Sequence, residues 1–481
     1  MVNKRTLGFW LGPLVALVIW LGVSPEGLSQ EGVAVLAGTC WMAIWWMTEA
    51  VPIAATALLP LILFPLSGAV ELSPLSKTYI SPILFLFIGG FMLALAMAKW
   101  NLHKRIALGI ISLVGADANR LVLGFMLATA FLSMWISNTA TTLMMVPIAG
   151  AVIDQFDHLG FTGAQDSGKM KLGAALMISI AYAASIGGMA TLVGTPTNLI
   201  FTGYVKEAYG LDVPFGQWMM MGIPVSVILL TVAWYSLTHW VFPLGSIKVP
   251  GARAEIRRQL KDLGPMKYQE GVVLAVFVTV AICWIIRSYV LKHFIPGIHD
   301  AMIGLVGALI LFSVPSGHGP GKRILDWDTA VKLPWGILLL FGGAFAIAFA
   351  FEQSGLAAWL AGQFSGLAGA PYIVILMVIV LSVVFLTEIT QNMATCTLMM
   401  PVMAALAPNL GVDPYALMIP VAFASSAAFM LPVATAPNAI VFGTGQFEMR
   451  DMIRAGFWLN LISAGVIVAI CYWGMSVVWG V

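Results

Sequence analysis

The sequence predicts an all-α polytopic membrane protein, and three observations support this fold class. The 481 residues are 60% hydrophobic and only 9% charged, whereas a soluble domain carries roughly 25% charged residues. The mean hydropathy is +0.96. Apolar runs close to the roughly 20 residues that a bilayer core requires recur along the whole chain. Together these observations exclude a soluble enzyme.

Charge and cysteine usage exclude further classes of protein. The formal net charge is only +2, so the overall balance gives no polyanion-binding face, and we expect no nucleic-acid partner. The cysteines lie inside apolar runs with no CxxC spacing, and the histidines are scattered. We therefore expect neither disulfides nor a metal cluster built from cysteine and histidine, and no organic cofactor.

The apolar runs predict about 11 transmembrane helices. They lie at about residues 7–23, 32–48, 51–66, 82–98, 172–204, 216–243, 270–290, 301–315, 334–352, 412–445 and 455–480. Two more apolar stretches, about 121–153 and 371–408, are interrupted at their centres by the polar tripeptides Ser137-Asn138-Thr139 and Gln391-Asn392-Met393. Because irregular backbone at membrane depth must line a cavity or be buried in protein, we interpret both stretches as re-entrant hairpins.

The less apolar stretches 102–114 and 356–365 each follow a long run. They suit either interfacial helices or ordinary loops.

Charge asymmetry predicts the orientation in a plasma membrane, which would be the inner membrane of a bacterium. The basic N-terminus resembles a signal peptide, but no small-residue cleavage site follows Val23, so we expect a retained first helix with a cytoplasmic N-terminus. The inside segments then hold all of the 23 Lys and Arg residues except Lys77, Lys206, Arg287 and Lys292. This split agrees with the positive-inside rule, and an odd number of crossings places the C-terminus outside.

The chain divides into two similar halves, residues 1–243 and 270–481, joined by a polar cytoplasmic linker at 244–269. The segment 86–91 matches 339–344, and the first tripeptide matches the second, with nine residues from asparagine to proline in both, Asn138 to Pro147 and Asn392 to Pro401. Further on, 194–198 and 434–438 interrupt corresponding apolar runs. Since the charge assignment places the first hairpin inside and the second outside, the repeats have inverted topology, which is typical of secondary transporters.

The interruptions have the chemistry of an ion and anion site. A broken helix exposes N–H groups that attract anions and C=O groups that attract cations. Asn, Ser and Thr side chains add both donors and acceptors. A single polar tripeptide in an apolar helix is more often an interhelical hydrogen bond, but the repeated pairing favours a functional site. Glu49 and Glu388 are the only acidic residues deep in the apolar runs; Glu388 suits either a stabilising or a titrating role.

At these residues the sequence resembles the divalent anion/sodium symporter family, whose members carry di- and tricarboxylates or sulfate. The similar segments are 45–52, 133–141 and 431–442. The resemblance implies a homodimer in which a scaffold part supports a transport part that moves like an elevator.

The resemblance also implies the site residues. One Na⁺ would use the carbonyls of Ser133 and Gly194 with the side chains of Ser137 and Asn138. A second would use the carbonyls of Thr387, Thr390 and Ala434 with the side chain of Asn392. The substrate would contact Asn138, Thr139, Thr195, Asn392, Met393 and Ala436. The family usually repeats Ser-Asn-Thr at the second tripeptide, where this chain has Gln391-Asn392-Met393. Since a thioether cannot donate, Gln391 is a candidate substitute donor.

We therefore expect a Na⁺-coupled secondary transporter that imports a small dianion, most simply a C4-dicarboxylate such as succinate, malate or fumarate. A sulfate or tricarboxylate symporter, and a Na⁺-independent anion exchanger of the same fold, remain alternatives. A channel would need a continuous polar pore. A membrane hydrolase would need a nucleophile, a base and an orienting group together, and no Asp lies deep in a crossing. We expect no enzyme.

Overall fold

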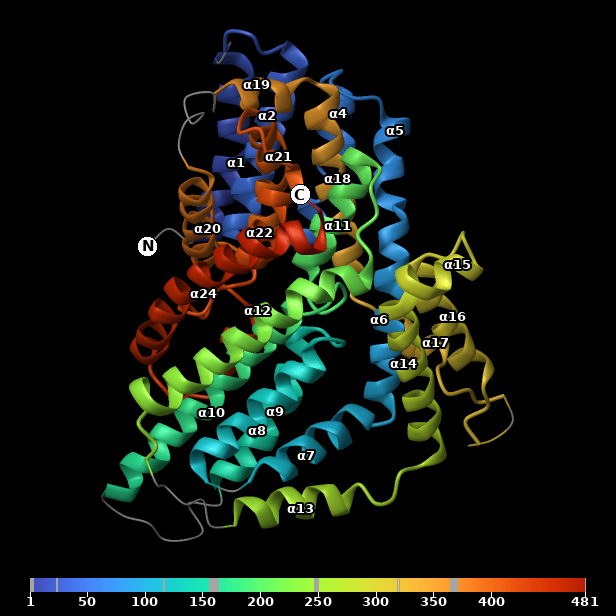
Figure 1. The fold of residues 1–481 in the computed structure, drawn as a ribbon. Coiled ribbons are helices and arrows are strands. Elements are labelled where there is room, and N and C mark those ends of the chain that lie inside the picture. The colour runs from blue at the N-terminus through green and yellow to red at the C-terminus, as the bar shows by residue number, and fades with distance from the viewer. Residues whose placement is uncertain are drawn as a thin grey trace.

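The computed structural model describes residues 4–22, 25–115, 117–154, 164–245, 251–317, 319, 321–363 and 371–480. Within these ranges the chain is helical and forms no strand, apart from an isolated bridge between Pro315 and Arg323 (Figure 1). Several sequence predictions touch residues outside these ranges: both extreme termini, Val23 and Ser24, residues 246–250 of the linker, and residues 364–365 of the second short stretch.

The first half of the chain contains helices of very different length. In order they are α1 (Lys4–Gly22), α2 (Gln30–Thr48), α3 (Ile53–Thr56), α4 (Pro60–Leu66), α5 (Leu72–Lys77), η1 (Thr78–Ile80), α6 (Pro82–Lys99), α7 (Leu102–Val114), α8 (Ala118–Ser133), α9 (Asn138–Asp154), α10 (Ala164–Met189), α11 (Pro196–Tyr209), α12 (Phe215–Tyr235) and η3 (Ser236–Val241).

The second half follows a similar order. After α13 (Ala252–Asp262) come α14 (Tyr268–Ile286), η4 (Arg287–Leu291), α15 (Lys292–Phe294), α16 (Asp300–Ser313), α17 (Trp327–Ala330), α18 (Trp335–Gln353), α19 (Leu356–Gln363), α20 (Tyr372–Ile389), α21 (Asn392–Asn409), α22 (Pro414–Ser425), α23 (Ala436–Phe442) and α24 (Met449–Val478). Thus α6 to α12 correspond in order to α18 to α24.

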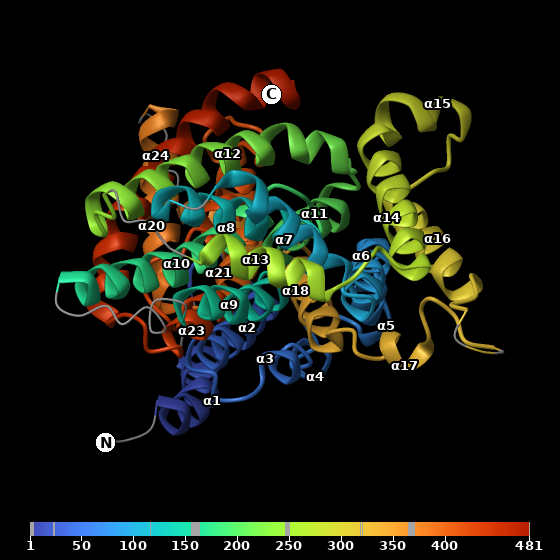
Figure 2. The same cartoon turned by 90° about the horizontal axis from the view of Figure 1, so that it is seen from below.

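Most expected runs coincide with helices. Eight helices in the described part are long and apolar enough to cross a membrane, and four shorter apolar helices accompany them. The number of eleven crossings therefore stays a prediction. Both short stretches after a long run form helices, α7 and α19, rather than loops. In Figures 1 and 2, α7 runs across one end of the bundle, beside α8 and α13.

Two segments differ from the expectation. The run 51–66 is not one helix but two short ones, α3 and α4. Pro60 begins α4, and the residues before it form tight turns. Since proline has no N–H group, it cannot donate the hydrogen bond that would continue α3 into α4. The linker 244–269 contains a helix, α13, which carries Arg253, Arg257 and Arg258 on its length and buries Ile256.

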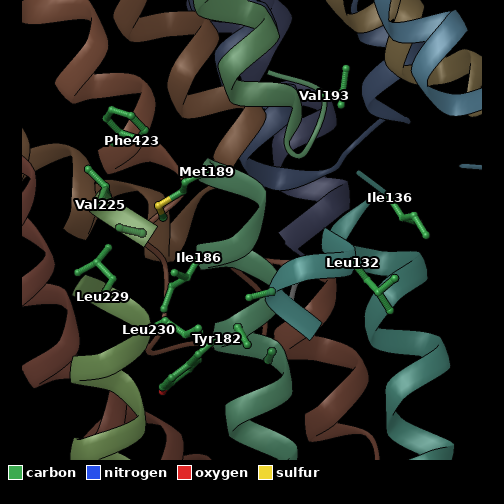
Figure 3. Close-up of a cluster of buried hydrophobic side chains, with 14 of the residues drawn as sticks. Leu132, Ile136, Tyr182, Ile186, Met189, Val193, Val225, Leu229, Leu230 and Phe423 are labelled. Carbon is green, nitrogen blue, oxygen red and sulfur yellow. The ribbon is translucent and has the colours of Figure 1, made fainter. Parts of the chain in front are cut away.

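Two apolar cores hold the helices together. The larger core joins α6 to α12 with α14, α16, α20 to α22 and α24. The smaller one, called here the second core, is built from α2 to α5, α18 and α19 and includes Ala394. Figure 3 shows part of the larger core, where side chains of α10 lie between those of α8 and α12. The residues labelled there are Leu132, Ile136, Tyr182, Ile186, Met189, Val193, Val225, Leu229, Leu230 and Phe423.

Candidate functional site

The helices end and restart where the polar segments lie. At the first tripeptide α8 ends at Ser133 and α9 begins at Asn138; at the second, α20 ends at Ile389 and α21 begins at Asn392. We call these interruptions the first tip (134–137) and the second tip (390–391). Two further interruptions, the first break (190–195) and the second break (426–435), separate α10 from α11 and α22 from α23. The sequence thus predicted all four.

Proline chemistry explains where the breaks end. Thr195 is extended, with φ −138° and ψ 143°, and is followed by Pro196 at the first position of α11. Thr435 has nearly the same conformation before α23, whose first turn contains Pro437. Since a residue before proline is disfavoured in the helical region and proline suits a helix start, α11 begins where its sequence requires.

A buried asparagine fastens each break in the same way. The Asn198 side-chain amide donates to the carbonyls of Gly188 at 3.1 Å and Thr191 at 2.7 Å. The Asn438 amide donates to the carbonyls of Ala428 at 3.1 Å and Leu431 at 3.0 Å. Both asparagines are fully buried. Their side chains therefore satisfy carbonyls that a broken helix leaves without partners.

At the first tip, oxygen atoms converge on Asn138. Its amide atom that faces inward lies 2.6 Å from Ser133 Oγ, 3.0 Å from the Ala184 carbonyl and 3.2 Å from the Gly194 carbonyl. With the NH₂ group inward, the amide donates to these three oxygens; with Oδ1 inward, the same atoms form a cluster of four oxygens. The Gly194 carbonyl lies in the unwound first break, whereas Ala184 lies within α10. Unwound carbonyls coordinate Na⁺ in broken-helix transporters. The donor set therefore fits a Na⁺ ion.

The second tip has a matching arrangement around Asn392. The Thr387 hydroxyl lies 2.8 Å from Asn392 Oδ1 and donates to the Ser425 carbonyl at 3.0 Å. Ser133 does the same at the first tip, where its hydroxyl donates to the Ala184 carbonyl at 2.7 Å. The carbonyls of Ala184 and Ser425 were not among the predicted site residues, since neither stands in a polar motif. The matched spacing of Ser133 to Asn138 and Thr387 to Asn392 was a usable signal.

Hydrogen bonds also join the two halves. Thr197 Oγ1 and Ser426 Oγ lie 2.6 Å apart and connect α11 to the second break. The Cys396 thiol of α21 lies 3.5 Å from the Thr197 carbonyl. The Tyr182 hydroxyl of α10 donates to the Phe429 carbonyl at 2.7 Å. Segments that are far apart in sequence thus meet in one buried region.

Glu388 acts on the second break. Its carboxylate accepts from the backbone N–H groups of Phe429 at 2.6 Å, Met430 at 2.8 Å and Leu431 at 2.9 Å. It also accepts from the Asn460 amide at 2.7 Å. Because the Glu388 side chain binds three consecutive backbone N–H groups of the break, the geometry favours the stabilising role that the sequence left open.

The other predicted residues lie around these centres without joining the same bonds. The Ser137 hydroxyl accepts from Ala140 N–H at 3.3 Å, and the Thr390 hydroxyl donates to the Leu386 carbonyl at 2.8 Å. Thr139 is half-buried, and Thr195 and Ala434 are buried beside the ends of their breaks, whereas Ala436 is exposed. Gln391 and Met393, which depart from the family pattern, have other partners.

Gln391 donates from its amide to Glu49 Oε1 at the end of α2. Met393 packs against both apolar cores. In this structure, therefore, one amide hydrogen of Gln391, the proposed substitute donor, is already used within the protein.

The site offers oxygen ligands only. No group of three or more His, Cys, Asp or Glu side chains that could hold a metal ion occurs within the described ranges. Carbonyl, hydroxyl and amide oxygens suit hard cations rather than zinc or copper.

Comparisons with known proteins match nearly the whole length of the chain. A family model described as the sodium:sulfate symporter transmembrane region matches residues 4–479. The sodium-dependent dicarboxylate transporter SdcS of Staphylococcus saprophyticus is 44% identical over 480 residues, covering 99% of this chain and 92% of that protein. SdcS of Staphylococcus aureus strain USA300 is 43% identical over the same shares.

Two solved structures share the fold at low sequence identity. The YdaH transporter of Alcanivorax borkumensis has a TM-score of 0.62 and 15% identity, covering 92% of this chain and 98% of that one. MtrF of Neisseria gonorrhoeae, which represents a class of antimetabolite efflux pumps, has a TM-score of 0.57 and 13% identity, covering 98% and 95%.

Proposed function

Because the chain belongs to the sodium:sulfate symporter family, which is the divalent anion/sodium symporter family, we propose that it imports a small dianion together with Na⁺. It is a multi-pass membrane transporter rather than an enzyme. The SdcS relatives are sodium-dependent dicarboxylate transporters. The substrate proposed for this chain is accordingly a C4-dicarboxylate such as succinate, malate or fumarate.

The observation that carries the proposal is the oxygen cluster at Asn138. The Ser133 hydroxyl and the carbonyls of Ala184 and Gly194 all lie 2.6–3.2 Å from the inward-facing atom of the Asn138 amide. The oxygens of this cluster can find a partner in two ways. Either the amide NH₂ group turns inward and donates to them, or a cation binds between them. Na⁺ binding at this point would therefore fasten the first tip to the first break.

A second Na⁺ is proposed at Asn392, with carbonyls of Thr387, Thr390 and Ala434. The substrate carboxylates would then meet the helix starts that these ions stabilise: α9 and α11 on one side, and α21 on the other. A helix N-terminus presents unpaired N–H groups and a partial positive charge, so it attracts a carboxylate without a lysine or arginine. Asn138, Thr139 and Thr195 would contact one carboxylate, and Asn392 the other.

The fold suggests how this site is reached from two sides. Inverted repeats with two re-entrant hairpins, an N-terminus inside and a C-terminus outside would allow each tip to open to its own side. An elevator movement of the part that contains both tips, against a scaffold in a homodimer, is the form of alternating access that the resemblance implies. These features belong to the proposal.

Uptake by purified protein in liposomes tests the function. Labelled succinate should accumulate with an inward Na⁺ gradient and not when K⁺ replaces Na⁺. Na⁺ should raise the affinity for succinate by the same factor as succinate raises the affinity for Na⁺, because coupling between binding sites is reciprocal. Uptake that is indifferent to Na⁺ would favour an exchanger, and sulfate that outcompetes every carboxylate would refute the dicarboxylate assignment.

A further inference from the structure

Glu49 links the end of α2 to the second tip. One carboxylate oxygen, Oε1, accepts from the Gln391 amide, and the other, Oε2, lies 3.3 Å from Arg5 Nη2. The Glu49 side chain is 39% exposed. The bond joins residues that are 342 positions apart, so it depends on how α2 and α21 pack.

The backbone at Glu49 is unusual and well anchored. Glu49 follows α2 in the left-handed region, with φ 50° and ψ 35°. Among the described residues only Asn101 shares a positive φ without being glycine. This conformation is unfavourable for a side chain with a Cβ and persists where the surroundings hold it. Here the Trp46 indole donates to the Ile53 carbonyl at 3.2 Å and closes the turn around Glu49.

The residues that follow the second tip pack into the second core, to which α2 also contributes. Ala394, in the first turn of α21, is 1% exposed and belongs to the second core, while Met393 packs beside it. The equivalent residue after the first tip, Ala140, is exposed. The equivalent of Gln391 is Ser137, whose hydroxyl folds back onto Ala140 N–H. Ser137 is thus bonded within its own segment, whereas Gln391 is bonded to a residue at the end of α2.

We propose that Glu49 is a positioning residue for transport, which acts through Gln391 to hold the second tip closed in this conformation. The proposal rests on the proposed alternating access. If the second tip opens during transport, it must move away from the end of α2, and the bond between Glu49 and Gln391 must break. Glu49 then sets how often the second tip opens, without touching substrate or Na⁺.

Cysteine labelling of the two tips tests this in the full-length transporter. Ala140→Cys and Ala394→Cys are placed separately in a background that lacks Cys40, Cys283, Cys396 and Cys471. Glu49→Gly removes the carboxylate but keeps a residue that suits the left-handed backbone. We expect the thiol introduced by Ala394→Cys to react about tenfold faster in Glu49→Gly, since a hydrogen bond to a charged group is typically worth that much or more. The thiol introduced by Ala140→Cys should react more slowly.

The controls separate positioning from a loss of folding. Asn101→Gly relieves the other positive φ without touching either tip, and should change neither rate. Glu49→Gln keeps an acceptor for Gln391 and should give an intermediate shift. Faster labelling at both cysteines would indicate general loosening, and unchanged rates at both would indicate that the bond holds nothing; either result overturns the proposal.

A pair exchange tests the partner. Gln391→Glu places a second carboxylate opposite Glu49 and should open the second tip further than Glu49→Gly, because like charges repel. Adding Glu49→Gln restores an amide and carboxylate pair, so the labelling rate of the Ala394→Cys thiol should return toward that in the background with Glu49 and Gln391 intact. Failure of the double variant to recover would contradict a direct link. Wild-type uptake measured alongside shows whether transport itself occurs, so failure of the proposed function is recognised separately.

Discussion

The two tips carry the same asparagine but differ in their surroundings. Asn138 faces two backbone carbonyls as well as Ser133 Oγ, and the residue after its tripeptide is exposed. Asn392 contacts Thr387, and the residues that follow it are packed into the second core. Repeats that are similar in sequence thus occupy unequal environments in one conformation. Such unequal environments agree with the alternating access proposed above, in which the two tips open at different times.

The two breaks differ in the way they are held. At the second, the Glu388 carboxylate binds three backbone N–H groups. At the first, Thr191 donates from its hydroxyl to the Met134 carbonyl and accepts from Gly194 N–H at 3.2 Å. Met134 occupies the place that corresponds to Glu388. A carboxyl group that holds the break in one repeat is therefore replaced by a hydroxyl group in the other.

The largest effect is expected at the asparagines themselves. Asn138→Ala and Asn392→Ala each remove an amide oxygen that we assign to a Na⁺, so Na⁺-driven succinate uptake should fall by more than the roughly 10–100-fold that loss of a supporting partner of a metal ligand costs. Uptake in liposomes measures this, with gel filtration and thermal melting to confirm folding. If both variants are folded and transport normally, the tips are not the site.

The next largest effect is expected on thermal stability, when the Glu388 side chain that holds the second break is changed. Glu388→Gln turns an NH₂ group toward backbone donors, and each buried group left without a partner costs about 1–3 kcal/mol. The matched change, Thr191→Val, removes neutral bonds worth about 0.5–1.5 kcal/mol each. The melting temperature of the purified protein should therefore fall more in Glu388→Gln than in Thr191→Val. The reverse order would show that the two fasteners contribute differently from what their geometry indicates.

A smaller effect is expected at the glycine beneath Asn138. A Cβ at Gly188 would lie 2.5 Å from Asn138 Oδ1, so Gly188→Ala should displace the amide and weaken Na⁺ affinity severalfold. The second break already carries Ala428 at the matching position, and Ala428→Gly should leave Na⁺ affinity nearly unchanged. The Na⁺ dependence of uptake and of thermal stability measures both. Equal affinities in wild type and Gly188→Ala would refute a close role for Asn138.

The smallest effect is expected at Met393. Met393→Thr removes apolar contacts with both cores but adds a donor near the second substrate carboxylate, worth about 0.5–1.5 kcal/mol for a neutral bond. Succinate affinity should improve by up to roughly tenfold, and Gln391→Ala should weaken it less than Asn392→Ala does. Competition by mono-, di- and tricarboxylates and sulfate against labelled succinate decides this. If Met393→Thr instead weakens the binding of another anion while it improves that of succinate, Met393 contacts that other anion as the native substrate.

The sequence by itself determined the class of protein and the places where its helices break. Composition and run length depend on residues taken one after another, and Pro196 or the polar Ser137-Asn138-Thr139 interrupts a helix through local backbone chemistry. The paired asparagines were visible for the same reason. The family pattern then supplied roles that no local rule contains.

Only the tertiary structure decided which partners these residues find. Glu388 fastens a break 41 to 43 residues away, and Gln391 reaches Glu49 across 342 residues. Neither bond follows from local patterns, because each depends on which helices pack side by side and how deeply. The same holds for the residues that follow the two tips: Ala140 and Ala394 have the same side chain, and only packing exposes the first and buries the second.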